Sequence, residues 1–129
     1  MRDHTKLRAF ELADEIVLLI YRLTVKFPKE EVYSLTSQMR RAAISVPSNI
    51  VEGCARESKL EYVRFLDISF GSLRELHYQF GVALRLGYIK DTESEECALK
   101  LLEAEKVIGA LIRSLRQNSI NTTSYTPKP

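Results

Sequence analysis

Apolar residues recur every three or four positions in four stretches of the chain, a spacing typical of amphipathic helices. The first stretch, residues 7–27, carries two such stripes side by side. One stripe consists of Phe10, Ala13, Val17, Ile20, Thr24 and Phe27, and the other of Leu12, Ile16, Leu19 and Leu23. Since a single buried face needs a stripe only about 100° wide, we expect the first helix to be covered from two sides.

A proline motif separates the first helix from the second. Phe27-Pro28 ends the first helix, because proline cannot continue a helix and disfavours helical geometry in the residue before it. Ser34 is the expected N-cap of a second helix that runs to about Arg56, and a start near Pro28 is the alternative. The apolar side of this helix is formed by Leu35, Met39, Ala42, Val46, Ile50 and Gly53.

Capping signals delimit the third helix. Ser58 and Glu61 form a capping-box pattern at its start, and Gly87 can adopt the left-handed conformation of a C-terminal cap after Leu86. This helix also carries two apolar stripes. They comprise Val63, Leu66, Phe70, Leu73, His77, Phe80 and Leu84, and Tyr62, Leu66, Ser69, Leu73, Leu76, Phe80 and Ala83.

The fourth helix is expected to begin at Asp91 or Thr92, with glutamates near the positive end of its dipole, and to end near Gln117. Residues 118–129 are polar and lack periodicity, which predicts a mobile tail. Four helices joined by short loops predict an all-α fold, an antiparallel up-down-up-down bundle formed by residues 1–117. The surplus apolar width on the first and third helices favours a homo-oligomer, since exposed apolar patches are normally interaction sites.

The second helix contains Pro47, which removes one backbone donor and crowds the carbonyl group of Ala43. We expect a kink there, and two shorter helices that meet at residues 45–47 are the alternative.

A polar stripe also follows this helix, formed by Arg41, Ser45, Asn49 and Glu52. One interpretation is a structural polar network that fixes how the helices meet, with Glu75 of the third helix as a candidate partner of Arg41. The other is a surface that binds a ligand. The structural interpretation is favoured.

Composition and charge narrow the possible functions. The 129 residues make one domain that is large enough for its own core, and the net charge of +2 is far from that of an obligate nucleic-acid binder. Between residues 34 and 66, however, the sequence contains five basic and three acidic residues, a local excess of positive charge. The longest apolar run, residues 16–20, is too short to cross a membrane, so we expect a cytoplasmic protein. Cys54 and Cys97 are expected to be buried, reduced thiols.

Residues with catalytic or metal-binding chemistry are scarce. His4 and His77 are the only histidines and neither follows a glutamate at the spacing of a di-metal site, so we expect no metal or cofactor. His77 is expected to be a hydrogen-bonded core residue. Gly71 and Gly81 are expected where another helix comes close. An enzyme that uses Glu52 and Glu75 is the least favoured hypothesis.

The sequence closely resembles the four-helix bundle protein family encoded by intervening sequences within bacterial 23S ribosomal RNA genes. The resemblance runs from about Leu7 to Leu115. The motifs that carry it are Phe27-Pro28 with Glu31 and Tyr33, Leu35-Thr36-Ser37-Gln38, Arg40-Arg41-Ala42-Ala43, Ser45, Pro47, Asn49-Ile50, Glu52-Gly53, Gly71-Ser72 with Glu75, and Leu86-Gly87-Tyr88. In the first helix, members often carry a Trp-Gln pair where this chain has Phe10-Glu11-Leu12-Ala13.

This resemblance implies a left-handed bundle that assembles into a homopentamer. It also points to accessory proteins of diversity-generating retroelements, similar pentamers that bind nucleic acid and a reverse transcriptase. We therefore predict a non-enzymatic homo-oligomer that binds nucleic acid, RNA rather than DNA, through phosphates and in a salt-sensitive way. The candidate phosphate-binding residues are Arg40, Arg56, Lys59 and Arg64. The alternative is a protein-interaction scaffold, or an accessory subunit, with no nucleic-acid binding of its own.

Overall fold

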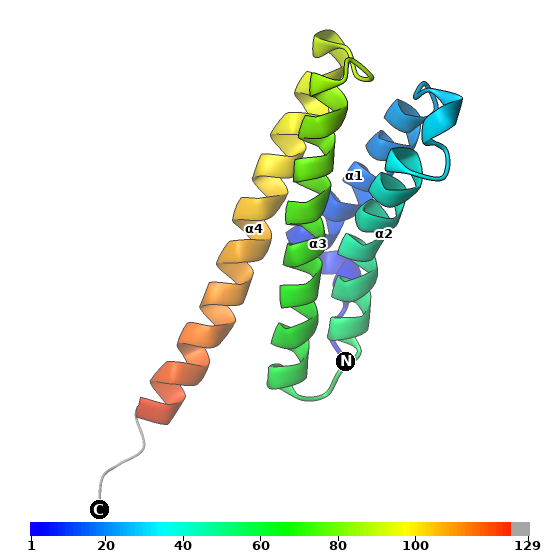
Figure 1. The fold of residues 1–129 in the computed structure, drawn as a ribbon. Coiled ribbons are helices and arrows are strands. Elements are labelled where there is room, and N and C mark those ends of the chain that lie inside the picture. Colours follow the sequence, from blue (N-terminus) through cyan, green and yellow to red (C-terminus); the bar gives the residue numbers. More distant parts are fainter. Residues whose placement is uncertain (125–129) are drawn as a thin grey trace, which may run out of the picture.

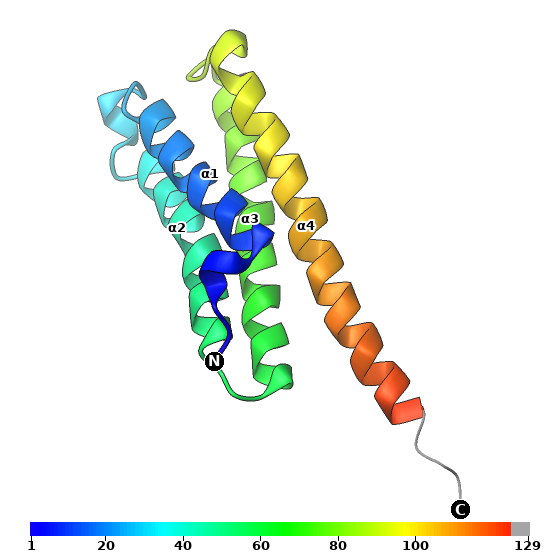
Figure 2. The same cartoon turned by 180° about the vertical axis from the view of Figure 1, so that it is seen from behind.

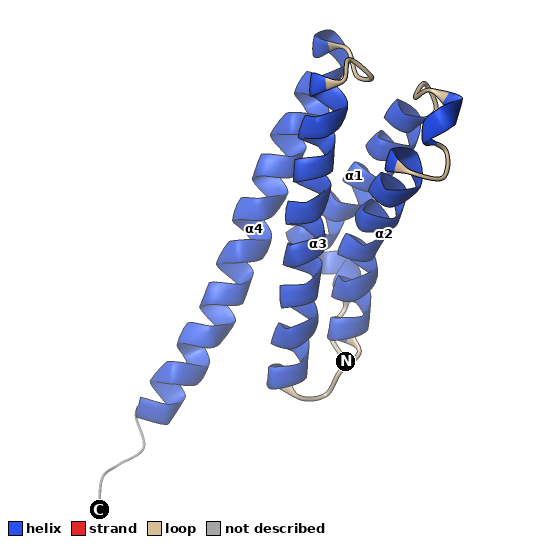
Figure 3. Ribbon diagram, viewed as in Figure 1, coloured by secondary structure: helices blue, strands red, loops and turns tan. Residues whose placement is uncertain are grey.

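A computed structural model describes the backbone of residues 1–124 and the side chains of residues 1–117. Within these limits the chain contains four α-helices and no β-strand (Figure 3). They are α1 (Arg8–Thr24), α2 (Leu35–Cys54), α3 (Lys59–Arg85) and α4 (Asp91–Ser124). Short 3₁₀ turns, η1 (His4–Lys6) and η2 (Lys29–Glu31), precede α1 and α2.

Successive helices run in opposite directions, so the predicted all-α, up-down-up-down arrangement is confirmed (Figure 1). Each helix packs against two others: α1 and α3 both contact α2 and α4. Seen from behind, α4 diverges from its neighbours toward its C-terminal end (Figure 2). The helix continues past Gln117 to Ser124, so its predicted end was too early. The rest of the predicted tail, residues 125–129, lies outside the described residues.

The core consists of large aliphatic and aromatic side chains from all four helices. The fully buried ones include Leu12, Ile16, Ile20, Met39, Ile50, Leu66, Leu73, Leu76, Phe80, Leu101 and Ile108. Both apolar stripes of α1 and of α3 are covered, wholly or partly, within a single chain. The reason is that a helix in a four-helix bundle faces two neighbours. Those double stripes therefore give no argument for a second copy.

The ends of α3 follow the expected capping chemistry. Ser58 Oγ accepts a hydrogen bond from the Glu61 backbone N–H at 3.1 Å. Gly87 has a φ of +79°, and the backbone N–H groups of Gly87 and Tyr88 donate to the carbonyl oxygens of Leu84 and Ala83. This is the Schellman pattern, in which a left-handed residue satisfies the last helical carbonyls.

Helix α2 continues without interruption through Pro47, which is buried. The alternative of two shorter helices is therefore wrong, while the kink remains a prediction. Gly53 lies where α2 packs tightly against α3: a Cβ atom there would lie 2.9 Å from Phe65 Cβ. Gly71 and Gly81, in contrast, have nothing within 4 Å of such an atom, so the expected helix contact at these two positions is absent from the described chain.

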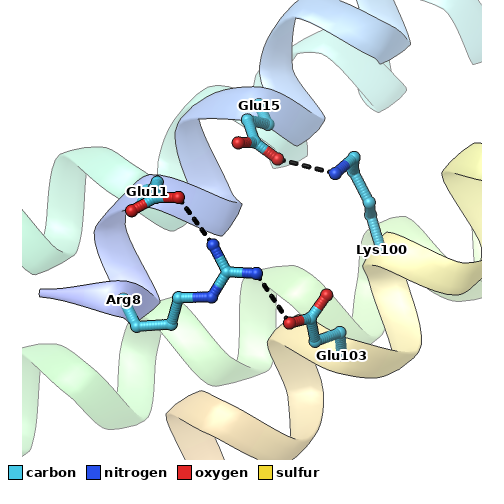
Figure 4. A network of polar contacts seen from close by, with 5 residues as sticks. All are labelled: Arg8, Glu11, Glu15, Lys100 and Glu103. Atoms are coloured by element: carbon cyan, nitrogen blue, oxygen red, sulfur yellow. Dashed lines mark hydrogen bonds and ion pairs between the residues drawn. The ribbon is translucent and has the colours of Figure 1, made fainter.

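Ion pairs join α1 to α4, the first and last helices of the bundle (Figure 4). Arg8 binds Glu11 on its own helix at 2.6 Å and Glu103 on α4 at 2.8 Å. Lys100 binds Glu15 at 2.7 Å. These side chains are partly exposed, and ion pairs open to solvent contribute only about 0–1 kcal/mol each, so the pairs add little to stability.

The two kinds of glycine predict opposite effects of alanine on stability. Gly53→Ala should lower the free energy of unfolding by about 1–3 kcal/mol, because the new methyl group overpacks the α2–α3 contact. Gly71→Ala should raise it by about 0.5–1 kcal/mol, because alanine favours the helix and fits into open space. Chemical denaturation measures both, and an equal effect of the two substitutions would contradict the packing described.

Candidate nucleic-acid interface

Three of the four predicted phosphate-binding residues lie at one end of the bundle, around the turn between α2 and α3. Arg56 is in the turn, and Lys59 and Arg64 are in the first turns of α3. The Cζ atoms of Arg56 and Arg64 lie 4.9 Å and 5.2 Å from the centre of the Phe65 ring. Contact with an aromatic face orients a guanidinium group while leaving its N–H donors available.

The N-terminal segment brings a fourth cation, Arg2, to the same turn (Figure 2). Its backbone N–H donates to the carbonyl oxygen of Cys54 at 3.0 Å, and its Nη1 donates to that of Arg56 at 2.9 Å. Its Cζ lies 4.1 Å from the centre of the Tyr62 ring. We call Arg2, Arg56, Lys59 and Arg64 the turn patch. Sequence reasoning missed Arg2, because no local pattern indicates that the N-terminus returns to this turn.

Carboxylates compensate part of the charge at this end of the molecule. Glu61 pairs with Arg64 at 3.2 Å, and Asp67 pairs with Arg116 of α4. Among the described residues, Arg2, Arg56 and Lys59 form no ion pair. Burial raises the pKa of Tyr62 to about 12, so its phenol stays protonated even in alkaline solution.

An open groove of about 600 Å³ adjoins the turn patch, between the start of α3 and the far part of α4. Its cations are Lys59, Arg64 and Arg116, its apolar wall is formed by Leu60 and Val63, and Glu61 and Asp67 line it as well. Leu60 is 80% exposed. This end of the bundle therefore offers guanidinium and ammonium groups beside an apolar surface.

The fourth predicted residue, Arg40, lies elsewhere. It precedes Arg56 by 16 positions, which corresponds to about 24 Å along a helix. Its Nε donates to Thr24 Oγ1 at 2.8 Å, and its Cζ lies 4.6 Å from the centre of the Tyr21 ring. The four predicted cations therefore do not form one site.

The predicted polar network exists only in part. Ser45 Oγ and Ser72 Oγ lie 2.8 Å apart, which joins α2 to α3. Asn49 Nδ2 donates to the carbonyl oxygen and to Oγ of Ser45, at 2.8 Å and 3.0 Å. Arg41 and Glu52 are exposed and, in the described part of the chain, bond to none of these groups.

Glu75 also stays out of this network. It accepts a hydrogen bond from Gln79 Nε2 at 3.1 Å, and no ion pair to Arg41 is formed among the described residues. The most deeply buried link between α2 and α3 is instead Ser69, whose Oγ donates to the carbonyl oxygen of Val46 at 2.7 Å. Ser69 stands in a predicted apolar stripe, and its polar role was not predicted.

The remaining candidates for chemistry are tied into ion pairs or buried. His77 is half-buried and bonds through Nδ1 to Glu105 of α4, which also pairs with Arg74 at 2.7 Å. Cys54 and Cys97 are free and buried, as predicted, and burial raises the pKa of Cys97 to about 12. No three His, Cys, Asp or Glu side chains of the described chain lie close enough to hold a metal ion. No helix in that part of the chain is both long and apolar enough to cross a bilayer.

Comparison with protein families shows which family the chain belongs to. Residues 5–110 match the family described as 23S rRNA-intervening sequence protein. The chain belongs to this family. The resemblance seen in the sequence is thereby confirmed.

A solved structure shares the family fold. It is the crystal structure of a protein of unknown function from the S23 ribosomal protein family of Bacteroides thetaiotaomicron, with a TM-score of 0.74 and 20% sequence identity. The alignment covers 81% of this chain and 97% of that one. At this identity the likeness concerns the fold alone. A search of functionally curated proteins found no significant match.

The buried link between α2 and α3 predicts a stability effect. Ser69→Ala should lower the free energy of unfolding by about 1–2 kcal/mol, because it leaves the Val46 carbonyl oxygen buried without this donor. Ser48→Ala, on the exposed side of α2, is the matched control and should change stability little. Urea unfolding measures both, and a loss no larger than that of the control would refute the assigned role.

Proposed function

We propose that this member of the family is a non-enzymatic, cytoplasmic homo-oligomer that binds nucleic acid, RNA in preference to DNA. The observation that carries this proposal is the turn patch, in which three guanidinium groups stand over Tyr62 and Phe65. Phosphate oxygens accept hydrogen bonds from such groups, and binding releases the counterions of the nucleic acid.

Self-association would strengthen a binding surface that is weak in one copy. The chain carries a net charge of only +2, so one turn patch attracts a polyanion weakly. Repetition in an oligomer raises the effective concentration of every further patch once one is bound. We propose a homopentamer, the state that the sequence resemblance implies.

Exposed apolar side chains support such an assembly. On α3 they are Leu60, Ile68 and Tyr78, and on α4 they are Leu99 and Leu102.

The first functional prediction concerns salt-sensitive binding. The protein should bind a labelled single-stranded RNA in ~50 mM salt and release most of it by ~200 mM, with each phosphate contact adding about 0.7–0.9 to the salt slope. The triple variant Arg56→Gln, Lys59→Gln, Arg64→Gln should bind weakly and show a shallower slope. Fluorescence anisotropy measures both quantities.

A matched triple variant controls for net charge. Arg22→Gln, Lys90→Gln and Lys106→Gln remove the same number of charges at exposed positions outside the turn patch. This variant should bind RNA nearly as well as the unmodified protein. Undetectable binding at low salt, or equal losses in the two variants, would overturn the proposal.

The second functional prediction concerns the assembly. With a mass of 14.8 kDa per chain, a pentamer has about 74 kDa, which light scattering measures at micromolar concentration. Ile68→Glu should reduce this mass, because it places a charge on the exposed face of α3. Val25→Glu is the control, because it places the same charge at an exposed position outside α3, at the C-terminal end of α1. A stable single chain at micromolar concentration would contradict self-association.

A protein-interaction scaffold is the second candidate, and the groove beside Leu60 favours it. An apolar groove of about 600 Å³ can seat an apolar side chain of another protein. A stoichiometric protein partner that remains bound after nuclease treatment, together with no RNA binding, would favour this function over the first.

A further inference from the structure

A second cationic surface lies at the opposite end of α2 from the turn patch. It is a groove of about 660 Å³ between the last turns of α1 and the first turns of α2, bordered by the segment that connects them. We call it the α1–α2 groove. Lys29, Arg40 and Arg41 line it, and none of the described residues that line it is Asp or Glu.

The three cations of this groove lack carboxylate partners. In the described chain, several other cations do pair with a carboxylate: Arg8, Lys26, Arg64, Arg74, Lys100 and Arg116. No such pair involves Lys29, Arg40 or Arg41. Positive charge gathered in a concave surface without compensation favours an anionic ligand.

Arg40 is held in a fixed orientation beside this groove. Its Nε–H is bonded to Thr24 Oγ1, and that hydroxyl donates to the carbonyl oxygen of Ile20 at 2.7 Å. Its guanidinium group lies over the Tyr21 ring. Because only one of its five N–H groups is engaged in this way, the other four remain for an anion such as phosphate or carboxylate.

The first turn of α2 adds donors to the same groove. Thr36 and Ser37, which line it, are the second and third residues of the helix, and backbone N–H groups at such positions have no partner within a helix. The first N–H group of the helix, that of Leu35, already donates to Glu31 Oε1 at 3.2 Å. Thr36 is only 6% exposed, yet its Oγ1 has no hydrogen-bond partner among the described residues. A buried hydroxyl without a partner is uncommon. This oxygen is closed off from solvent in the ligand-free chain, so it meets a ligand in the groove only if the side chain turns.

The rim of the groove is aromatic and apolar. Tyr33 is 97% exposed, and Val25, Val32 and Ile44 are exposed beside it. An exposed tyrosine ring offers a face on which a flat ring stacks, and base–aromatic stacking is sequence-tolerant. The ligand that fits this rim carries a flat ring in addition to its anionic group.

We propose that the α1–α2 groove binds one nucleotide unit, with its phosphate held by Arg40, Arg41 and the first turn of α2 and its base stacked on Tyr33. A turn of the Thr36 side chain about its Cα–Cβ bond presents the hydroxyl to the phosphate. This site is separate from the turn patch, and it binds a free mononucleotide whether or not the turn patch binds RNA.

Adenosine 5′-monophosphate, inorganic phosphate and adenosine are the probes that test the site. The full chain, labelled with 3-fluorotyrosine, has six tyrosines whose ¹⁹F signals report binding, and Tyr33→Phe assigns the signal of Tyr33. The mononucleotide should shift the signals of Tyr33 and Tyr21 and bind about tenfold more tightly than phosphate or adenosine alone. A shift of neither signal at millimolar mononucleotide would overturn the proposal, as would equal affinity for phosphate alone.

Single substitutions separate this site from the turn patch. Arg41→Gln, at an exposed position, should weaken mononucleotide binding about fivefold or more and leave the fold intact. Lys59→Gln, in the turn patch, is the matched control and should leave that binding unchanged. Equal weakening in both variants would show unspecific attraction and overturn the site. A failure of RNA binding with mononucleotide binding retained would sink only the proposed function.

Two further outcomes bear on what occupies the groove. Thr36→Val should keep or raise thermal stability, because it removes an unpartnered hydroxyl, and should weaken mononucleotide binding. Tighter binding of an acidic peptide than of the mononucleotide would overturn the assignment to nucleotides. Protection of Tyr33 from chemical iodination in the ligand-free assembled protein would overturn it as well, because another copy would then cover the groove.

Discussion

The close packing of α2 against α3 is the constraint on which the rest of the molecule depends. Gly53 lets the two backbones approach where any larger side chain would meet Phe65, and Ser69 fastens α3 to the carbonyl oxygen of Val46. This contact holds Phe65 and Tyr62 beneath the arginines of the turn patch. It also places one cationic surface at each end of α2, which is a single continuous helix through Pro47.

The fold could be predicted from the sequence because its signals are local. The three-four spacing of apolar residues, Phe27-Pro28, Ser58 and Gly87 each act through neighbouring atoms, and the structure confirms the elements they delimit. Glycine was harder to interpret. A glycine inside a helix looks the same in the sequence whether another helix touches it, as at Gly53, or open space does, as at Gly71. That difference depends on which face the neighbouring helix meets, and this is a tertiary property.

The candidate site could be predicted only in part, for the same reason. The sequence prediction placed Arg40 in one site with Arg56, Lys59 and Arg64, because all four are cations close together in the chain. In the structure most of the length of α2 separates Arg40 from the other three. Arg2 was missed because only folding returns the N-terminus to the α2–α3 turn. The polar stripe of α2 was misleading in a similar way: Ser45 bonds to Ser72 of α3 and Asn49 bonds to Ser45, whereas Arg41 and Glu52 are exposed and take no part. Spacing in a helix gives the direction of a side chain, but its partner comes from another helix.

The separation of the two cationic surfaces determines how they act together. They lie about 24 Å apart along α2, roughly three times the Debye length of about 8 Å at physiological ionic strength. Neither surface therefore strengthens the electrostatic potential of the other in that medium, and a net charge of +2 adds little over longer distances. Cooperation between them requires a ligand that touches both, such as one continuous single strand, or several copies of the chain that repeat each surface. On these proposals a mononucleotide is expected to bind the α1–α2 groove more tightly than the turn patch, whereas a long polyanion reaches both surfaces, so the length of the ligand is the variable that distinguishes their contributions.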